Sequence, residues 1–428
     1  MGSRFALRPL WRSGRLVGCA LTLLVATTLL GACTGLLPGE QPSPVVVIVT
    51  ATPTPGGAAT PAPLPTPAGA ATDTPTAIPT TAAGDATATP AAAVGDATAA
   101  PAPAARPGLL QRVRERGRLI CGANADLPGF GFYDRVRDQW SGFDVDFCRA
   151  IAAAIFDDPD AVEFIGLTTS GPNERFAAVR NGTVDVLIRN TTWTLGRDIA
   201  GLAFGPTTFH DGQTFMVRAS ARIATSADLA GKRICVARGT TSEQNLTDDF
   251  AARGITFEAV LFDDEGQLYP AYDRGECDAV TSDSSQLVSK RQTLSVPADH
   301  VILGERISRE PLGPVFIEND EQWRDVVSWV VFATIYAEEL RVSQENVEQQ
   351  RAQSDDPRVR RLLGVEGEFG QGLGLSNDFA YAIIREVGNY GDIYDRNLGP
   401  RTPFALDRGP NKAWNLGQGG VLASPPFR

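Results

Sequence analysis

The sequence predicts a protein of the mixed α/β class, folded into two lobes that are joined by a hinge. Apolar strand-like runs alternate with helical spacing of apolar residues after Arg106, and this alternation occurs twice in succession. About 320 residues follow Arg106, which is more than one hydrophobic core usually supports. The polar clusters of this region come directly after predicted strands, and open α/β sheets bind ligands at the carboxyl ends of their strands. Together these observations predict a ligand cleft between two α/β lobes.

The first lobe is predicted from a βαβαβ unit, which implies parallel strands. A buried strand is expected at 117–124, followed by a helix within 142–156 that Asp144 or Asp146 would cap. The unit is completed by a strand at 161–167, a helix at 173–182 and a strand at 183–190.

The pattern repeats in the second lobe, where predicted strands end at Gly239, near residue 263 and at Asp283. A helix-rich region from about 319 to 390 is expected to return to the first lobe. We expect the connecting segments near Thr214–Ala219 and His300–Ile307. The folded part is therefore divided into 107–217 (first lobe), 218–305 (second lobe) and 306–428 (return to the first lobe and C-terminal helices).

Residues 1–32 have the features of an export signal. Four arginines precede an apolar stretch, Leu16–Leu30, that is too short for a comfortable membrane span. The letters LLGAC end at Cys33 and resemble a bacterial lipobox, in which the signal is cut before the Cys and lipid is attached to it. An ordinary signal peptide with an incidental Cys is the alternative. We expect an extracytoplasmic protein, anchored to the cell membrane by lipid on Cys33.

Residues 33–106 are rich in Pro, Ala and Thr and contain almost no aromatic residues. Such a segment cannot bury enough apolar surface to offset its ordering entropy, so we expect a disordered tether. Its one apolar run, Pro44–Thr50, would suit a position near the membrane.

Charge and cysteine content narrow the function further. The net charge of -11 argues against nucleic acid as a partner. Four cysteines remain after the signal and Cys33 are set aside, and an even number in an exported chain suggests disulfides. Of the three possible connectivities we favour Cys121–Cys148 with Cys235–Cys277, because each pair then lies within one lobe. A zinc site is the alternative, but there is no CxxC motif and there are only 2 His, so we expect no metal.

The segment DVLIRNTTWTLGRD, residues 185–198, follows a predicted strand and suits a small anion. Arg197 is the best candidate, because a guanidinium holds a carboxylate through two parallel hydrogen bonds. Arg189 is a second candidate that could instead form a structural ion pair. Further donors or cleft walls are expected at Asn190, Thr192, Trp193 and Thr194. For Trp193, bracing of the loop is the alternative to lining the cleft.

The second lobe offers complementary groups at its own strand ends. The segment GTTSEQ lies at a predicted strand-to-helix turn, where free N–H groups attract an anion, and Thr240, Thr241 and Ser242 could bind or cap. Asp283 suits an ammonium group, with helix capping as the alternative. Phe130 could form an aromatic wall or belong to the core. An Arg for a carboxylate on one lobe and an Asp for an ammonium on the other describe an α-amino acid, whose binding would favour a closed state.

Several segments together resemble a known family. They include CGANADLPGFGF, GFDVDFCRAIAAAIF, VDVLIRNTTWTLGRD, DGQTFMV, ICVARGTTSEQNL, CDAVTSDSSQL, EPLGPV and VEGEFGQGLGLSNDFAYAIIREVGNYGDIYDRNLG. The chain after Arg106 looks like the general L-amino-acid-binding proteins of bacterial polar amino-acid ABC importers, which are type II periplasmic binding proteins of solute-binding family 3. The resemblance implies a two-lobed Venus-flytrap fold that captures L-amino acids and delivers them, as a monomer, to a permease and an ATPase.

The resemblance also implies roles for individual residues. Arg197 and Thr192 should hold the ligand carboxylate, Thr241 or Ser242 should assist, and Asp283 should take the α-ammonium. The four cysteines fall where the family carries paired cysteines. Many relatives of narrow specificity place an aromatic residue near Leu127, and an aliphatic residue there fits broad specificity. The sequence leaves the preferred amino acid undecided.

An enzyme on the same lobes, for instance a dehydratase, is a competing interpretation. It would need an acid or base poised over the ligand. Neither His210 nor His300 lies in a cleft motif, and Glu310, the best spare acid, has a simpler role in the loop before Pro311. We therefore expect a non-catalytic protein without a cofactor. A sensor that presents the amino acid to a membrane receptor is a further alternative, because it would differ from a transport protein only in its partner.

Overall fold

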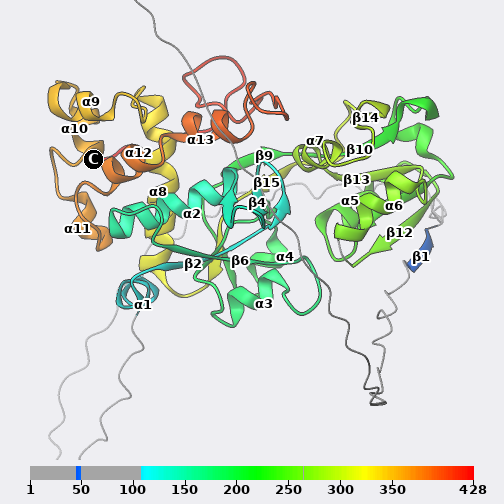
Figure 1. Cartoon of the computed structure of the whole chain (residues 1–428), viewed down its shortest axis with the longest axis horizontal. Coiled ribbons are helices and arrows are strands. Elements are labelled where there is room, and N and C mark those ends of the chain that lie inside the picture. The colour runs from blue at the N-terminus through cyan, green and yellow to red at the C-terminus, as the bar shows by residue number, and fades with distance from the viewer. Residues whose placement is uncertain (1–44, 50–107, 264) are drawn as a thin grey trace, which may run out of the picture. The chain divides into compact units, whose positions relative to one another are not determined.

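A computed structural model of the chain describes residues 45–49, 108–263 and 265–428 (Figure 1). The predicted signal peptide, Cys33 and most of the predicted tether lie outside these residues. Two large sheets are present, and each is covered by its own helices, as expected for two α/β lobes.

The first lobe is built on a five-stranded sheet with the order β6-β2-β7-β16-β8. Its strands are β2 (Leu119–Ala123), β6 (Val162–Gly166), β7 (Val186–Leu187), β8 (Leu202–Phe204) and β16 (Val315–Ile317). β2 pairs in parallel with β6 and β7, as the βαβαβ pattern predicted. β16 pairs antiparallel with β7 and β8, so the sheet is mixed and not purely parallel. A small sheet beside it contains β3 (Asp126–Leu127), β4 (Gly131–Asp134) and β5 (Gln139–Ser141).

The helices of the first lobe include three from the start of the folded part and one short turn of helix. They are α1 (Leu109–Arg116), α2 (Phe143–Phe156), α3 (Arg175–Arg180) and α4 (Leu195–Asp198). Helix α2 begins after Gly142, whose φ of 131° suits glycine, so the predicted capping role of Asp144 or Asp146 is wrong. Both carboxylates lie in the first turn of α2 instead, where the positive end of the helix dipole favours them.

The C-terminal helices pack on the first lobe, as predicted. They are α8 (Glu321–Glu339), α9 (Val347–Gln353), α10 (Pro357–Leu362), α11 (Phe369–Leu373), α12 (Phe379–Glu386) and α13 (Tyr390–Asn397). Helices α8 and α12 contact α2 and each other, and in Figure 1 they are the yellow and orange ribbons next to α2. Their buried faces, which include Trp323 of α8, join one hydrophobic core that also contains Phe143 and Phe147 of α2.

The second lobe is built on a six-stranded sheet with the order β1-β12-β11-β13-β10-β14. Its strands are β1 (Val45–Val49), β10 (Gln213–Arg218), β11 (Arg233–Ala237), β12 (Phe257–Phe262), β13 (Ala279–Asp283) and β14 (His300–Ile302). Its helices are α5 (Thr241–Ala252), α6 (Glu265–Arg274) and α7 (Ser284–Arg291), with 3₁₀ turns at Ala219–Ala221, Ser226–Leu229 and Pro297–Asp299. Separate hydrophobic clusters contain Phe250 and Tyr272, so this lobe has its own core.

Strand β1 was not expected, because Val45–Val49 belong to the predicted disordered tether. These residues pair antiparallel with β12, with Val45 opposite Leu261 and Val49 opposite Phe257. A run of β-branched residues favours an extended conformation, and the edge of β12 offers it backbone hydrogen-bonding groups. The apolar run within the tether therefore adds a strand to the second sheet.

The chain passes between the two large sheets through a separate two-stranded ladder of β9 (Phe209–Asp211) and β15 (Glu310–Leu312). This differs from the connections expected near Thr214–Ala219 and His300–Ile307. Thr214 and His300 lie inside the second sheet, in β10 and β14, because these strands pair with each other. The apolar character of the two segments had indicated strands but not the sheet that they join.

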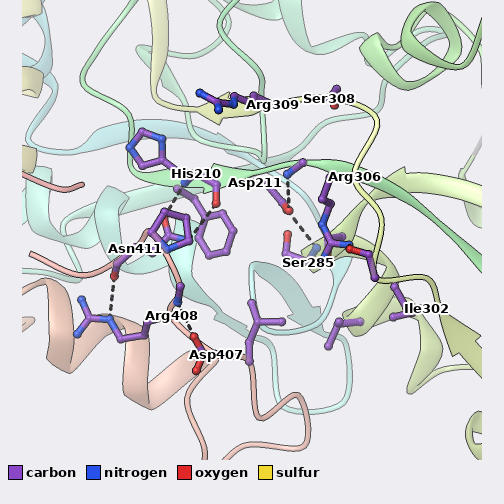
Figure 2. Close-up of a pocket in the computed structure, with 18 of the residues that line it drawn as sticks. His210, Asp211, Ser285, Ile302, Arg306, Ser308, Arg309, Asp407, Arg408 and Asn411 are labelled. Carbon is purple, nitrogen blue, oxygen red and sulfur yellow. Dashed lines mark hydrogen bonds between the residues drawn. The ribbon is translucent and has the colours of Figure 1, made fainter. Parts of the chain in front are cut away.

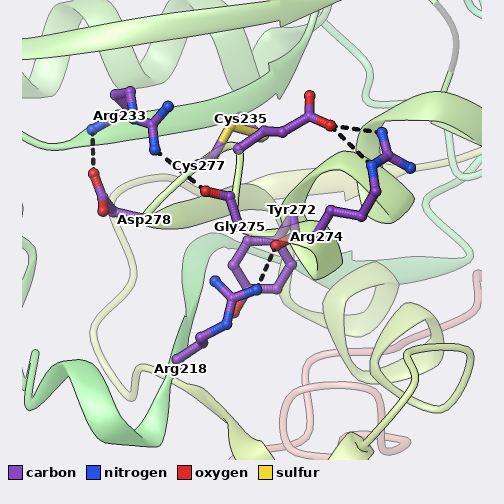
Figure 3. Close-up of a disulfide and its surroundings, with 9 residues drawn as sticks. Arg218, Arg233, Cys235, Tyr272, Arg274, Gly275, Cys277 and Asp278 are labelled. Atoms are coloured by element: carbon purple, nitrogen blue, oxygen red, sulfur yellow. Dashed lines mark hydrogen bonds and ion pairs between the residues drawn. A yellow bond between two sulfur atoms is a disulfide. The ribbon is translucent and has the colours of Figure 1, made fainter.

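Both favoured disulfides are present and each lies within one lobe. Cys121 on β2 is bonded to Cys148 on α2, and Cys235 on β11 is bonded to Cys277 just before β13. In Figure 3, the second disulfide lies near a turn that is held by Arg233, which donates from Nη2 to the Gly275 carbonyl at 3.2 Å. Closing loops with sequence separations of 27 and 42 residues stabilises each lobe by roughly 3–4 kcal/mol through loop-closure entropy. Among the described helices, none combines the length and apolar character that a membrane span requires.

Candidate functional site

One pocket collects polar groups from strand ends of both lobes, and we call it the inner pocket. The first lobe contributes Arg175, Asn190, Thr192 and Arg197. The second lobe contributes Ala237, Thr240, Thr241, Ser242, Glu265, Leu268, Tyr269, Thr281, Ser282, Asp283 and Gln286. Seven of the ten residues predicted to bind ligand thus lie in one pocket, and Phe130, Trp193 and Thr194 do not line it.

Arg197 is the central cation of the first lobe's half of the pocket. It lies on α4, which Thr194 caps by accepting a hydrogen bond from the Arg197 N–H at 3.2 Å. Its Nη1 donates to the Thr192 carbonyl at 2.6 Å, and its guanidinium carbon lies 5.1 Å from the centroid of the Phe176 ring. Burial lowers the pKa of Arg197, while the carboxylates of Glu310 and Asp283 oppose this shift. The guanidinium is therefore held in place before any anion arrives.

Three residues that were predicted to bind ligand do not line the inner pocket. Phe130 is 1% exposed and lies in the first lobe's core, with its ring centroid 5.3 Å from that of Phe209, because edge-to-face aromatic packing draws it inward. The Trp193 ring stacks on Phe204 at a centroid distance of 5.7 Å, and the backbone N–H of Trp193 donates to the Pro311 carbonyl at 2.9 Å. Thr194 is the cap of α4. Of the two roles open for Trp193, the structure shows bracing of the loop.

The second lobe contributes the N-terminus of α5 to the pocket. Thr240 caps this helix, because its Oγ1 accepts from the Glu243 N–H at 3.2 Å. Thr241 Oγ1 lies 3.5 Å from Thr192 Oγ1 of the other lobe. The Ser242 carbonyl accepts from Gln213 Nε2 at 2.9 Å, which ties the start of α5 to β10. Thr240 is thus the cap of α5, and Thr240, Thr241 and Ser242 all line the inner pocket at a turn where free N–H groups favour an anion.

Asp283 is the acidic counterpart of Arg197 at the end of β13. It is 6% exposed, and its Oδ1 has no hydrogen-bond partner among the described residues. It stands in the capping position of α7 without making a side-chain cap, so the capping alternative does not apply. Burial raises the pKa of Asp283 well above its ordinary value, and the nearby carboxylates of Asp211, Glu310 and Glu265 raise it further. An ammonium group would supply the missing partner.

The inner pocket also contains residues that were not predicted from the sequence. Arg175 and Glu265 are the first residues of α3 and α6, and both line the pocket. Gln286 on α7 accepts from Asn190 Nδ2 at 2.9 Å and donates to the Tyr269 hydroxyl at 3.1 Å. A helix start after a strand was the only signal that could have marked Arg175 and Glu265.

Arg175 and Arg189 form a cationic group beside Glu265. Burial lowers the pKa of Arg175 well below its ordinary value, and the neighbouring guanidinium groups of Arg189 and Arg197 lower it further. Arg189 Nη2 lies 4.0 Å from Glu265 Oε1, so the structural ion pair foreseen for Arg189 joins the two lobes. The Arg175 Nε has no partner among the described residues.

The two lobes are closed on the pocket. Besides the Asn190–Gln286 bond, Ser289 Oγ donates to the Pro128 carbonyl at 2.6 Å and Lys290 Nζ donates to the Asp126 carbonyl at 2.8 Å. The cavity that remains has a volume of about 30 Å³. A larger ligand can therefore enter and leave only when the lobes separate.

A larger cavity of about 890 Å³ lies beside β9, one of the two strands of the ladder that joins the lobes (Figure 2). Asn411 brackets the hinge strand β9: its Oδ1 accepts from the His210 N–H at 2.6 Å, and its Nδ2 donates to the His210 carbonyl at 3.0 Å. On the second-lobe side, Asp211 Oδ2 accepts from the Ser285 N–H at 3.1 Å. The C-terminal segment and α7 therefore both hold the strand about which the lobes are joined. His210 takes part through its backbone, and the described residues contain no group of three or more His, Cys, Asp or Glu suited to a metal ion.

Comparison with known proteins gives one family and several similar chains. Residues 119–345 match the model of the bacterial extracellular solute-binding proteins, family 3. The general L-amino acid-binding periplasmic protein AapJ of Rhizobium johnstonii is 44% identical over 328 residues, which are 76% of this chain and 94% of the relative. The glutamate/glutamine/aspartate/asparagine-binding protein BztA of Rhodobacter capsulatus is 44% identical over 326 residues, 76% of this chain and 95% of that protein. A solved ABC transporter / periplasmic binding protein from Brucella ovis, with glutathione bound, is 44% identical, with a TM-score of 0.73, and the match covers 76% of this chain and 100% of that one.

Proposed function

We propose, from the premise that this chain belongs to family 3 of the bacterial extracellular solute-binding proteins, that it captures L-amino acids outside the cytoplasm for an ABC importer. Two relatives at 44% identity are named as amino-acid-binding proteins, which supports this ligand class. The observation that carries the proposal is the placement of Arg197 and Asp283, a half-buried guanidinium and a buried carboxyl group from opposite lobes, in one pocket.

The ligand's α-carboxylate would be held by the first lobe. One Arg197 donor, Nη1, is bonded to the Thr192 carbonyl, and the other guanidinium N–H groups would bind the carboxylate. Thr192 Oγ1 and the N-terminus of α5 would add further donors. The α-ammonium would be held by Asp283, whose Oδ1 has no other partner among the described residues. Because the two ends of one zwitterion bind to different lobes, the ligand stabilises the closed form by its higher affinity for that form.

The side chain of the ligand would point toward Arg175, Glu265 and Gln286. These groups include donors and acceptors of both charges, which suits several side chains. Leu127, whose aliphatic character indicated broad specificity, is fully buried in the core and is not among the described residues that line the inner pocket. We therefore propose that Arg175, Glu265 and Gln286, and not Leu127, select the side chain of the ligand.

We further propose that the protein delivers its ligand to a permease and an ATPase. It would do so as a monomer without catalytic activity. The two relatives are named as binding proteins, and the solved chain from Brucella ovis is named as an ABC transporter / periplasmic binding protein. The sensor alternative uses the same site and the same closure, so only the membrane partner separates the two roles.

Titration of the purified protein with each of the twenty amino acids tests the ligand class. We expect several L-amino acids to bind and their D-enantiomers to bind at least about tenfold more weakly, since inversion removes one charge-assisted contact or misplaces the side chain. Isothermal titration calorimetry at pH 7 measures both series, and the D-series is the matched control. Absence of heat with all twenty amino acids would rule the proposal out.

We also propose that lipid on Cys33 anchors the protein to the cell membrane. The LLGAC segment supports this assignment. Cys33→Ser is expected to move the protein from the membrane fraction to the soluble fraction of fractionated cells. Cys19→Ser, which changes a cysteine inside the predicted signal, is the control that should leave the protein with the membrane. A Cys33→Ser protein that stays in the membrane fraction and still carries lipid contradicts the assignment.

A further inference from the structure

We propose that the first lobe carries a second binding site, beside the start of α2, and that this site takes a phosphate monoester, either as a soluble compound or as the headgroup of a lipid. The pocket, which we call the outer pocket, has a volume of about 510 Å³ and shares no lining residue with the inner pocket. The inference therefore stands independently of the amino-acid ligand proposed for the inner pocket.

The outer pocket forms where the start of α2 meets the end of α13 and the segment that follows α13. Its walls include Gly142, directly before α2, and Thr402 in the C-terminal segment. Phe404 forms an apolar wall and packs against the core of the first lobe. Gly129 permits this packing, because a Cβ on this residue, whose φ is 88°, would lie 2.7 Å from the Phe404 ring. No described residue of the second lobe lines the pocket, so the pocket does not depend on closure of the lobes.

Positive charge exceeds negative charge among the described residues that line the outer pocket. The charged side chains there are three guanidinium groups and one carboxylate, those of Arg149, Arg396, Arg401 and Asp146. The chain as a whole has a net charge of -11, so a local excess of two positive charges contrasts with the rest of the protein. This excess suits a phosphate monoester, which carries close to two negative charges above neutral pH, better than an anion with one charge.

Asp146 holds two of the three arginines in place. It is 4% exposed and accepts from Arg396 Nη2 at 2.7 Å, from Arg396 Nε at 3.1 Å and from Arg149 Nη1 at 3.2 Å. Arg149 Nη2 also donates to the Trp140 carbonyl at 2.9 Å. Arg396 Nη2 likewise donates to the Val387 carbonyl at 2.9 Å. Arg149 Nε and Arg396 Nη1 make no hydrogen bond to another described residue, so an anion would meet donors that are already oriented and would require little further ordering of side chains.

Arg401 is the third arginine of the outer pocket, and its side chain has no hydrogen bond or ion pair among the described residues. It is exposed, so its guanidinium can turn toward a phosphate and bind two of the oxygens through its planar fork. Pro403 and Phe404 line the same pocket and would contact the carbon atoms of the ester. Because Arg401 supports no other described group, it can be replaced without loss of a contact within the protein.

Isothermal titration calorimetry of the full-length protein with glycerol 3-phosphate tests the site in solution. The titration is done at pH 8 in about 0.1 M NaCl, which screens attraction between charges that are far apart. We expect saturable binding that Arg401→Gln weakens by about tenfold or more, since a neutral amide replaces the guanidinium. Arg222→Gln is the matched control, because Arg222 of the second lobe is also exposed and its side chain has no partner among the described residues. This control should bind glycerol 3-phosphate as the unchanged protein does.

Vesicles distinguish a lipid headgroup from a soluble compound. The Cys33→Ser protein is used here, because it cannot carry lipid on that residue. Its cosedimentation with phosphatidylcholine vesicles that contain phosphatidate, whose headgroup is glycerol 3-phosphate, is compared with that of the same protein carrying Arg401→Gln. Vesicles that contain phosphatidylglycerol, a phosphate diester, are the control for general attraction to a negative surface.

The two measurements together decide the inference. Binding of glycerol 3-phosphate that Arg401→Gln weakens, without phosphatidate-dependent cosedimentation, assigns the outer pocket to a soluble phosphate monoester. Cosedimentation that requires phosphatidate and falls in Arg401→Gln assigns it to a lipid headgroup. If neither probe binds, or if Arg401→Gln leaves the binding of both unchanged, the inference is overturned, and the proposal for the inner pocket is unaffected.

Discussion

Arg197→Ala is expected to remove amino-acid binding, with affinity reduced by at least about 100-fold for every L-amino acid that the unchanged protein binds. Two charge-assisted hydrogen bonds from a guanidinium to a carboxylate contribute roughly 3–5 kcal/mol together, and a buried carboxylate left without them carries a desolvation cost as well. In the protein itself the change removes one bond, to the Thr192 carbonyl, and a contact with the Phe176 ring. The fold should therefore persist.

The measurement is isothermal titration calorimetry, with circular dichroism and thermal unfolding to show that the variant is folded. Arg197→Lys should retain the charge but lose the planar fork, so its affinity should lie between those of the other two proteins. Arg118→Ala, which removes an exposed guanidinium paired with Glu163, is the control that should bind normally. Normal affinity in a folded Arg197→Ala protein would exclude Arg197 from the site.

Asp283→Asn is expected to weaken amino-acid binding by about 100-fold at pH 8, because a neutral amide replaces the carboxylate that faces the ammonium. The affinity of the unchanged protein should increase with pH. Burial, Asp211, Glu310 and Glu265 raise the pKa of Asp283, so in the empty protein this carboxyl must lose a proton before it can pair with an ammonium. The variant should lose most of this pH dependence.

The same group should make the empty protein less stable as the pH rises. In the unfolded chain the pKa of an Asp is about 3.9, and in the folded protein that of Asp283 lies well above this, so the folded state binds the proton more tightly. The free energy of unfolding therefore decreases as the pH rises from about 4 through the raised pKa. Calorimetric melting of both proteins without ligand should show a shallower decrease in Asp283→Asn. Asp325→Asn, which changes an exposed carboxylate, is the control. If the affinity for amino acids depends on pH equally in the unchanged protein and in both variants, the role of Asp283 is contradicted.

The local pattern of the sequence was sufficient to predict much of the candidate site. Strand and helix periodicity placed Thr192, Arg197, Thr240–Ser242 and Asp283 at strand ends, and strand ends of one sheet meet at one edge. All of these residues line the inner pocket. The disulfides were also accessible, because cysteines within one lobe are brought together by neighbouring elements.

The local pattern of the sequence did not predict the environment of a side chain that suits both the cleft and the core. Phe130 follows a strand, as a cleft residue would, but aromatic neighbours from distant segments, such as Phe209, take it into the core. Trp193 is 43% exposed and stacks on Phe204, a partner that no spacing within the loop reveals. The exact limits of the connecting segments were not predictable for the same reason, because an apolar run indicates a strand but does not say which sheet it joins.

The sequence by itself therefore determined the α/β class, the two lobes, the disulfide pairs and the charged groups at the strand ends, since these follow from periodicity and residue chemistry over short distances. Only the tertiary structure decided which of those side chains meet across the cleft. Arg175 and Glu265 are 90 positions apart in the chain, and their role near Arg189 depends on the packing of one lobe against the other. The unpartnered donor of Arg175, its Nε, is also visible only there, because a missing partner is a property of the whole surrounding structure and not of a local stretch of sequence.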